Sequence, residues 1–346
     1  MRSPLTARPT AAKTITTLAS LAVLGGVLLT NGCDEARAIT VTAPSFATPG
    51  AGPTVTPTGA ANSIDGLPGT LFYRRDSDDS GPAVFRIDRG GKRTPLPDDA
   101  VVSPDGRRVA WTAGESDLLV ADLGATRAWR TFRHVAAGYG FRPVWSADGT
   151  QILTGVARAG EDISSSQPTP VVIRLADSKV TPLPKSLRGY LHYRWSGDGK
   201  TVVFTTGECV LKYAPVSGAP VRTVPVLGSQ DSRVNPKFMR ACDVVGVSTD
   251  GTRVAVDLHI GDEPDGDIAG SLVADTVIDT ATGALHRLPV TGKVISLAYG
   301  PSGDLLVRSE QHGKRTLTLI SPADIVLATV SEPVSLKNLE LYQYTR

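Results

Sequence analysis

A short turn sequence, Ser-x-Asp-Gly, recurs along this chain at a nearly constant interval. Copies begin at residues 103, 146, 196 and 248, and an altered copy begins at residue 300. Successive copies start 43, 50, 52 and 52 residues apart. Self-similarity at such a period indicates a repeat architecture in which each repeat is one supersecondary unit. No other feature of the sequence restricts the fold as strongly.

Each copy lies between two stretches with the composition of β-strands. An apolar residue precedes the turn, as Trp145 and Trp195 do, and a strand-like run follows it. Asp-Gly between two such runs is a strong hairpin signal, because Gly accepts the positive φ that the turn needs. Two further strand-like runs complete each unit. The sequence therefore predicts units of four antiparallel strands, named a to d, with the Asp-Gly turn joining a to b.

The two ends of the repeat region complement each other. Residues 70–96 precede the first turn and contain runs for strands b, c and d alone, whereas residues 336–344 are strand-like and have no unit of their own. We expect this last segment to supply strand a of the first unit, because a ring closed in this way has no exposed sheet edges. The predicted fold is all-β: a six-bladed β-propeller of four-stranded antiparallel blades, closed by the C-terminal strand pairing with the first blade.

The repeat resembles that of the TolB-like propeller family, a WD40-like repeat in which Trp precedes Ser-Pro-Asp-Gly and a strand follows. The match covers residues 67–346, and its best copies are 144–149 and 194–199. The altered copy departs from the pattern, with Gly300 and Ser302 in place of Ser and Asp. The resemblance implies a protein–protein role in the bacterial envelope.

The first 33 residues have the features of a bacterial signal peptide. Arg2, Arg8 and Lys13 precede an apolar stretch. The segment ends Leu-Thr-Asn-Gly-Cys33, which resembles a lipobox, in which the Cys is lipidated. Thr30 stands where Leu is usual, so an ordinary cleaved signal and an uncleaved anchor remain alternatives. We expect an exported protein, lipid-anchored through Cys33 on the extracellular side of the cell membrane, or secreted.

Residues 34–66 are rich in Thr, Pro, Ala and Gly and have few large apolar residues. Such a segment cannot bury enough surface to fold, so we expect a disordered tether leading to a propeller domain at 67–346. Cys209 and Cys242 are the cysteines beyond this tether, and two cysteines in an exported chain favour a disulfide. Cys209 falls in a b–c connection and Cys242 at the end of the next d–a connection, which emerge on the same face of a propeller. The alternative is two separate buried thiols.

The long loops all fall on the face opposite the Asp-Gly turns, which we call the long-loop face. They are residues 76–82, 134–142, 157–168, 185–192, 228–241 and 260–270. Insertions gathered on one face of a repeat fold usually mark its binding face, and aromatic and Arg side chains are typical of interaction hot spots. The candidate binding residues are Tyr139, Phe141, Arg142, Arg188, Tyr190, Arg233, Lys237, Phe238 and Arg240.

Charge and motifs argue against several functions. The chain has 36 Lys and Arg against 34 Asp and Glu, a balance that disfavours a nucleic-acid surface. The acidic stretches 76–79 and 262–267 do not have the order of a calcium loop, so solvated loops are the preferred interpretation. The sequence contains no Gly-x-Ser-x-Gly, His-Glu-x-x-His or Cys-x-x-Cys. We therefore expect no metal, no cofactor and no catalytic residues.

The sequence thus predicts a non-catalytic, envelope-tethered scaffold that binds a protein, peptide or envelope ligand through the long-loop face as a monomer. An extracellular propeller lyase or hydrolase, or a small-molecule sensor, with its site at the channel mouth, remains an alternative. An enzyme should have a convergent polar pocket with a strongly perturbed titratable group, whereas a scaffold should have an apolar, Arg-rich surface.

Overall fold

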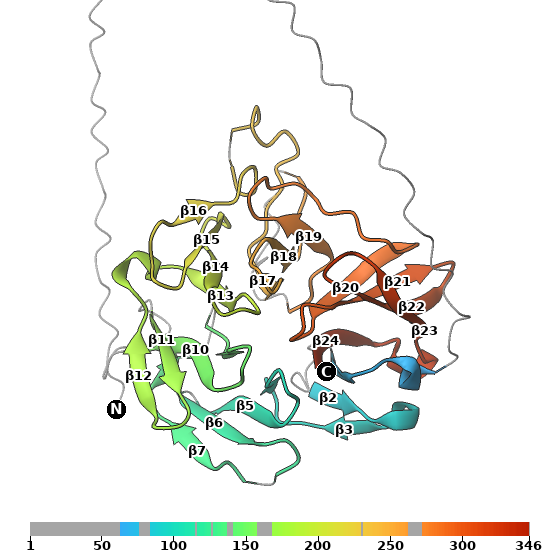
Figure 1. Cartoon of the computed structure of the whole chain (residues 1–346), viewed down its shortest axis with the longest axis horizontal. Helices are drawn as coiled ribbons and strands as arrows, with labels where there is room; N and C mark the ends of the chain where they lie inside the picture. The colour runs from blue at the N-terminus through green and yellow to red at the C-terminus, as the bar shows by residue number, and fades with distance from the viewer. Residues whose placement is uncertain are drawn as a thin grey trace, which may run out of the picture. The chain divides into compact units, whose positions relative to one another are not determined.

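Six antiparallel sheets surround a common centre in the computed structural model (Figure 1). The model describes residues 63–345 except 76–83, 115, 126, 137–140, 158–167, 230 and 262–271. The described residues belong to one compact unit, Val55–Arg346. The predicted six-bladed all-β propeller is therefore confirmed. The predicted signal segment, Cys33 and tether residues 34–62 lie outside the described residues.

The described chain begins shortly before the expected domain boundary at residue 67. Ser63 accepts a hydrogen bond from the Asp65 N–H and so caps a short 3-10 helix, η1 (Ile64–Gly66). Ile64 is buried and packs into the core between the first and last blades. The last residues of the predicted tether thus form part of the folded domain.

The strands of the first three blades follow the predicted order, except that blade 3 has a fifth, two-residue strand, β8 (Val135–Ala136), within the predicted loop 134–142. Blade 1 holds β1 (Thr70–Arg75), β2 (Val84–Ile87), β3 (Arg93–Pro95) and β24 (Leu339–Thr345). Blade 2 holds β4 (Val101–Val102), β5 (Arg108–Ala113), β6 (Asp117–Asp122) and β7 (Arg130–Phe132). Blade 3 holds β8 (Val135–Ala136), β9 (Val144–Trp145), β10 (Gln151–Val156), β11 (Thr169–Arg174) and β12 (Lys179–Pro182).

The remaining blades continue the same pattern. Blade 4 holds β13 (Leu191–Trp195), β14 (Thr201–Thr205), β15 (Leu211–Pro215) and β16 (Arg222–Thr223). Blade 5 holds β17 (Val244–Val247), β18 (Arg253–Val256) and β19 (Thr276–Asp279), and blade 6 holds β20 (Lys293–Tyr299), β21 (Leu305–Gln311), β22 (Lys314–Ile320) and β23 (Val326–Ser331). In blade 5, the place of strand d is taken by a single bridge between Ile278 and Leu285.

The C-terminal strand closes the ring as predicted. β24 pairs antiparallel with β1, with Leu71 opposite Tyr344 and Arg75 opposite Leu339. The Gln343 side chain continues the contact into blade 2, because its Oε1 accepts a hydrogen bond from the Val102 N–H at 3.0 Å. The first blade is therefore built from both ends of the described chain.

The Asp-Gly turns are held by one repeated set of hydrogen bonds. In the second copy, Ser146 Oγ donates to Asp148 Oδ1 at 2.6 Å and accepts from the Gln151 N–H at 2.9 Å. Gly149 closes the turn with φ of 65°. Burial alone would raise the pKa of Asp148, but the hydrogen bonds from Ser146 and Thr150 outweigh it and hold this pKa below its ordinary value.

The hydrophobic core is divided among the six interfaces between adjacent blades. Each of six buried clusters joins residues of two neighbouring blades, as where Leu153 of blade 3 meets Phe204 of blade 4. A middle strand therefore packs on both faces, which explains why β14 is a continuous apolar run rather than an alternating one. Trp145 also links blades 3 and 2 by a hydrogen bond, because its Nε1 donates to the Val101 carbonyl at 3.0 Å.

Candidate binding site

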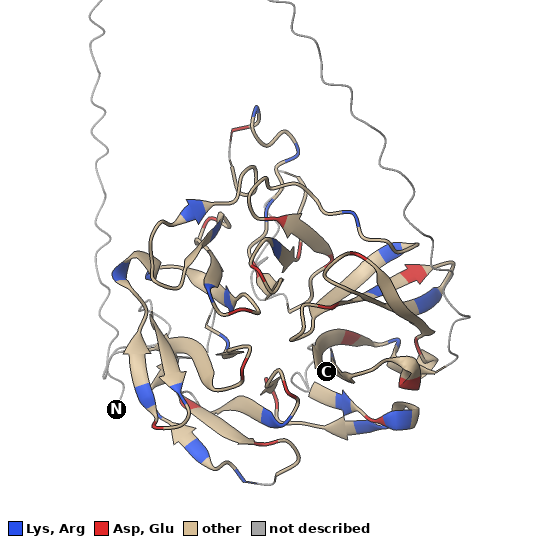
Figure 2. Ribbon diagram, viewed as in Figure 1, with Lys and Arg blue, Asp and Glu red and all other residues tan. Residues whose placement is uncertain are grey.

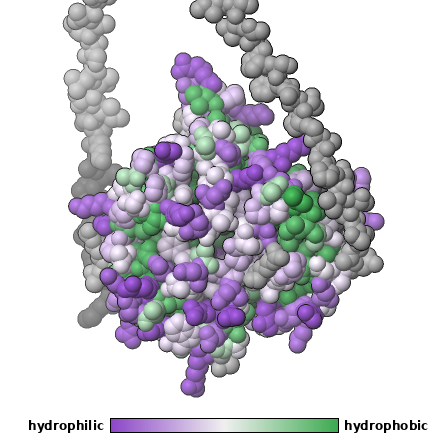
Figure 3. All heavy atoms as spheres, in the orientation of Figure 1, coloured by the Kyte–Doolittle hydropathy of each residue, from purple (hydrophilic) through white to green (hydrophobic). Residues whose placement is uncertain are grey.

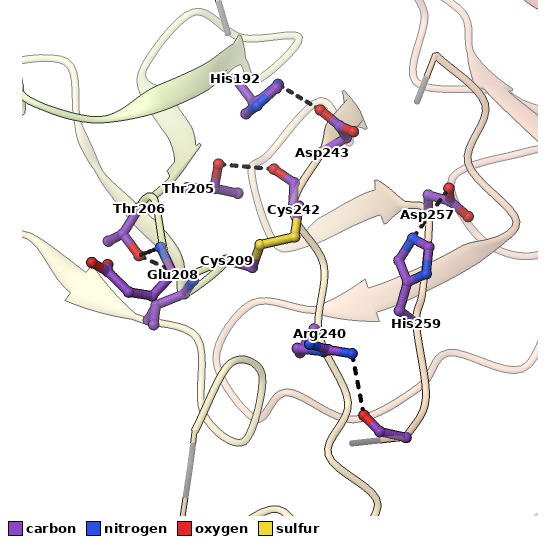
Figure 4. Close-up of a disulfide and its surroundings, with 12 residues drawn as sticks. His192, Thr205, Thr206, Glu208, Cys209, Arg240, Cys242, Asp243, Asp257 and His259 are labelled. Atoms are coloured by element: carbon purple, nitrogen blue, oxygen red, sulfur yellow. Dashed lines mark hydrogen bonds and ion pairs between the residues drawn. A yellow bond between two sulfur atoms is a disulfide. The ribbon is translucent and has the colours of Figure 1, made fainter. Parts of the chain in front are cut away.

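Connections of two kinds, b–c and d–a, are joined at the base of the loop 228–241. Cys209, in the b–c connection of blade 4, forms a disulfide with Cys242, just before β17, with Cα atoms 4.3 Å apart (Figure 4). Arg240 and His259 exchange two backbone hydrogen bonds of 2.9 Å, which joins this loop to the b–c connection of blade 5. The predicted disulfide is confirmed, and these loops share one face.

The loop 228–241 is organised around the buried side chain of Asn235. Its amide nitrogen donates to the carbonyls of Ser229 and Met239 at 3.1 and 3.0 Å, and its Oδ1 accepts from the Met239 N–H at 2.8 Å. Gly228 has φ of 75°, and a Cβ there would lie 2.6 Å from the Cys209 carbonyl oxygen. The loop thus has a fixed backbone with a base that admits no side chain at residue 228.

The tip of this loop projects beyond the sheets and carries basic and apolar side chains together (Figures 1, 2 and 3). Arg233 and Lys237 are exposed, and Val234 is 50% exposed. Arg233 is held by a two-pronged ion pair with Asp231, at 3.0 and 2.9 Å. Ile260, which follows the Arg240–His259 bridge, is 61% exposed. This surface therefore mixes apolar and basic side chains.

Phe238 and Arg240 belong to the base of the loop rather than its tip. Both are half-buried, and Phe238 has a positive φ of 47°. Arg240 Nη2 donates to the Gly261 carbonyl at 3.3 Å. Arg240 therefore joins the loop to the neighbouring connection, while Phe238 lies at the base of the same loop.

The other predicted residues are distributed over two more connections. Tyr139 lies outside the described residues. Phe141 is 4% exposed and packs 5.9 Å from the Tyr193 ring, so its side chain lies in the core between blades 3 and 4. Arg188 is exposed, and Tyr190 is half-buried and stacked on Phe204 at 4.4 Å. Among the described contacts, none joins Arg188 or Tyr190 to the loop 228–241.

Arg142, the last of the predicted residues, lines a cavity of about 170 Å³ that opens among the inner strands. It pairs with Asp99 at 3.3 Å. Arg194 lines the same cavity, and sequence reasoning did not select it because its place in β13 has the pattern of an ordinary strand residue. The pair of His192 and Asp243 was also not identified from the sequence. His192 Nδ1 and Asp243 Oδ1 lie 2.5 Å apart, and both side chains are nearly buried beside the disulfide (Figure 4).

A second cavity, of about 310 Å³, opens among the turns of blades 5 and 6. Asp324, in the wall of this cavity, accepts hydrogen bonds from Arg253 Nη1 and Nη2 at 2.8 and 3.0 Å. Its Oδ1 also lies 3.0 Å from His286 Nε2. Burial would raise the pKa of Asp324, but these partners outweigh it and lower that pKa. A carboxylate held ionised in this way is a poor general acid at neutral pH.

Within the part of the chain that the structure describes, no helix has the length and apolar character needed to cross a membrane. Among the same residues, no group of three or more His, Cys, Asp or Glu side chains is arranged to hold a metal ion. The acidic stretches 76–79 and 262–267 lie outside them.

These observations define the class of the protein: a six-bladed β-propeller with an ordered loop on its long-loop face. No protein-family model matches the sequence, and no curated protein matches it. Comparison with solved structures gives TolB of Acinetobacter baumannii, with 15% identity, a TM-score of 0.47 and coverage of 80% of this chain and 65% of TolB.

Two other solved structures have similar scores. The hydrazine synthase of Kuenenia stuttgartiensis shows 16% identity and a TM-score of 0.43, covering 72% of this chain and 80% of that one. A putative TolB of Agrobacterium tumefaciens shows 11% identity and a TM-score of 0.42, covering 76% and 90%. The chain thus spans about two thirds of the length of the first TolB, and similarities this distant do not transfer an activity or partner.

Proposed function

We propose that this protein is a non-catalytic binding scaffold of the bacterial envelope. The loop 228–241 would contact a protein, peptide or envelope ligand through Arg233, Val234 and Lys237, with Ile260 extending the surface. A partner for such a surface combines an apolar patch with acidic groups, because the exposed charges at the contact are mainly basic. The export signal, Cys33 and the tether would hold the propeller at the outer side of the cell membrane.

The observation that best supports this proposal is the rigidity of the loop. Asn235 uses its amide in three hydrogen bonds, and the disulfide and the Arg240–His259 bridge fix the base. An exposed loop that is already ordered loses little conformational entropy when it binds, which favours affinity. Arg is also one of the residue types enriched at interaction hot spots.

The carboxylates whose pKa values are shifted are poorly suited to acid–base catalysis near neutral pH. Wherever their surroundings shift the pKa of an Asp or Glu, as at Asp148, Asp198 and Asp324, the shift is downward. A general acid or base that works near neutral pH needs a shift in the other direction.

Affinity capture from envelope extract tests the proposal. The full-length protein is compared with the double variant Val234→Asp/Lys237→Glu and with the control Val180→Asp, a residue on β12 that is 47% exposed. We expect wild type and control to retain the same partner and the double variant to lose it. Recovery of that partner by the double variant at the wild-type level would contradict the proposed contact surface.

The membrane tether has a separate test. Metabolic labelling with a fatty-acid analogue should label the wild-type protein, and Cys33→Ser should abolish the label. Equal labelling of both proteins would exclude Cys33 as the lipidated residue, while capture of the partner by the loop could still be measured.

A further inference from the structure

The cavity in the central channel receives side chains from every blade. Its wall includes Val102, Trp145, Arg194, Val245, Tyr299 and Gln343, which come from blades 2, 3, 4, 5, 6 and 1. The volume of about 170 Å³ can hold a small polar group but not a drug-sized molecule. The cavity is therefore a product of ring closure, since no single blade could form it.

Two guanidinium groups face this cavity from adjacent blades. Arg142 keeps an ion pair with Asp99 at 3.3 Å, and Asp99 is 43% exposed on its side chain. Arg194 Nε and Nη1 donate to the carbonyls of Val245 and Tyr193 at 3.3 and 2.8 Å. Among the described contacts, Arg194 is thus held by backbone carbonyls rather than by a carboxylate.

Arg142 and Arg194 line the same cavity, and the positive charge of Arg142 acts on Arg194. Burial, and next the positive charge of Arg142, lower the pKa of Arg194 to about 10, which the milder influence of Tyr342 and Asp243 does not restore. Asp243 is also engaged by His192 at 2.5 Å. Like charges held near each other in a partly desolvated place create a site that an anion would stabilise.

Tyr342 adds a neutral donor to the same wall. Its hydroxyl is buried and has no hydrogen-bond partner among the described residues. The side-chain amide of the neighbouring Gln343 already makes hydrogen bonds with the backbone N–H and carbonyl of Val102. A buried hydroxyl without a partner costs free energy, so a ligand oxygen within its reach would be favoured.

We propose that the central channel is an oxyanion site, in which one carboxylate or phosphate group lies between the guanidinium groups of Arg142 and Arg194 and accepts a hydrogen bond from Tyr342. A planar guanidinium group can donate two parallel hydrogen bonds to two oxygens of one carboxylate or phosphate. The apolar part of the wall consists of Val101, Val245 and Leu272. The cavity therefore has room for one carboxylate or phosphate group but not for a second polar group. The site is independent of the loop 228–241 and of the partner proposed for it.

Calorimetric titration of the full-length protein tests this site with inorganic phosphate and with acetate in separate arms, at constant ionic strength set with chloride. We expect saturable binding of one equivalent of phosphate, of acetate or of both, and the arms show which oxyanion chemistry the site accepts. Tyr342→Phe should weaken that binding roughly tenfold, because a hydrogen bond to a charged group is lost. Arg194→Gln should abolish it.

The control is Arg222→Gln, an exposed Arg on β16 outside the cavity, which should bind like wild type. If Arg194→Gln does not fold, Arg142→Gln together with Tyr342→Phe carries the test. Absence of saturable binding in both arms, or wild-type affinity in the cavity variants, overturns the proposal. Neither result would affect partner capture by the loop, so the two proposals fail separately.

Discussion

Arg308 and Glu332 form an ion pair in the interior, with 2.8 Å between Arg308 Nε and Glu332 Oε1 and side chains that are 4% and 1% exposed. Tyr73 of β1 donates its hydroxyl to Glu332 Oε1 at 2.6 Å, and Arg308 Nη1 donates to the Leu339 carbonyl at 2.6 Å. Burial, and next the charge of Glu332, raise the pKa of Tyr73, so it remains a neutral donor. This cluster therefore ties blade 6 to both strands that close the ring.

Replacing Glu332 by Gln should lower the free energy of unfolding by about 3–5 kcal/mol, because Arg308 would keep a buried charge without its counter-ion. Urea unfolding measures this loss. The control is Glu310→Gln, whose carboxylate pairs with Arg315 at 2.7 Å near the surface and should cost no more than about 1 kcal/mol. Similar small losses in both variants would contradict the role assigned to the buried pair.

Removing the closing strand should prevent the domain from folding. A chain that ends at residue 338 lacks β24, so β1 becomes an exposed edge and Tyr73 loses Leu341 opposite it. Circular dichroism and size-exclusion chromatography should show lost cooperative unfolding and aggregation. Val334→Asp, at a residue that is 85% exposed, should leave both measurements unchanged. A monomeric truncated chain with wild-type stability would refute closure by this strand.

Reducing the disulfide should destabilise the protein and loosen the loop 228–241. The bond joins residues 33 positions apart, and loops of this size gain about 2–4 kcal/mol from a cross-link. Thermal unfolding with and without reductant gives the difference. Cys209→Ser/Cys242→Ser should match the reduced protein and show no response to reductant. A melting temperature unaffected by reductant in the wild type would argue against this contribution.

The hydrogen bonds of the Asp-Gly turns should make the free energy of unfolding depend on pH in the acidic range. In the native state Asp148 has a pKa below its ordinary value, so its stabilisation is complete above about pH 4 and is lost as the pH falls through the native pKa. Ser146→Ala removes the shortest hydrogen bond to this carboxylate. The pKa of Asp148, followed by NMR, should rise in this variant, and unfolding at pH 7 should cost about 1 kcal/mol less. An unchanged pKa would count against the network.

Local turn chemistry made most of the fold predictable. The hydrogen bonds of Ser146 that hold the turn reach residues at most five positions away, so each copy shows its geometry in the sequence. The strand bounds are less predictable. Strand d of blade 5 consists of one bridge at Leu285, and Pro289 has no N–H to extend it.

The site was less accessible to sequence reasoning, because its geometry depends on residues that are distant along the chain. Phe141 and Arg233 look alike as loop residues with large side chains, yet Phe141 fills the core and Arg233 is exposed. Arg142 and Arg194 face one cavity only after blades 3 and 4 are placed beside each other. Asn235 could have been suspected, since a lone Asn inside a long loop often organises its backbone.

The pairing of β24 with β1 also governs when this protein can mature. A ribosome finishes Thr70–Arg75 long before it reaches Leu339–Thr345, so the sheet that β1 begins waits for a strand made after those of the other blades. Throughout that interval the nascent polypeptide carries an incomplete sheet, which is the kind of species that chaperones bind. Mutations in the last seven-residue strand are therefore expected to act during biogenesis, before the mature protein exists to be destabilised.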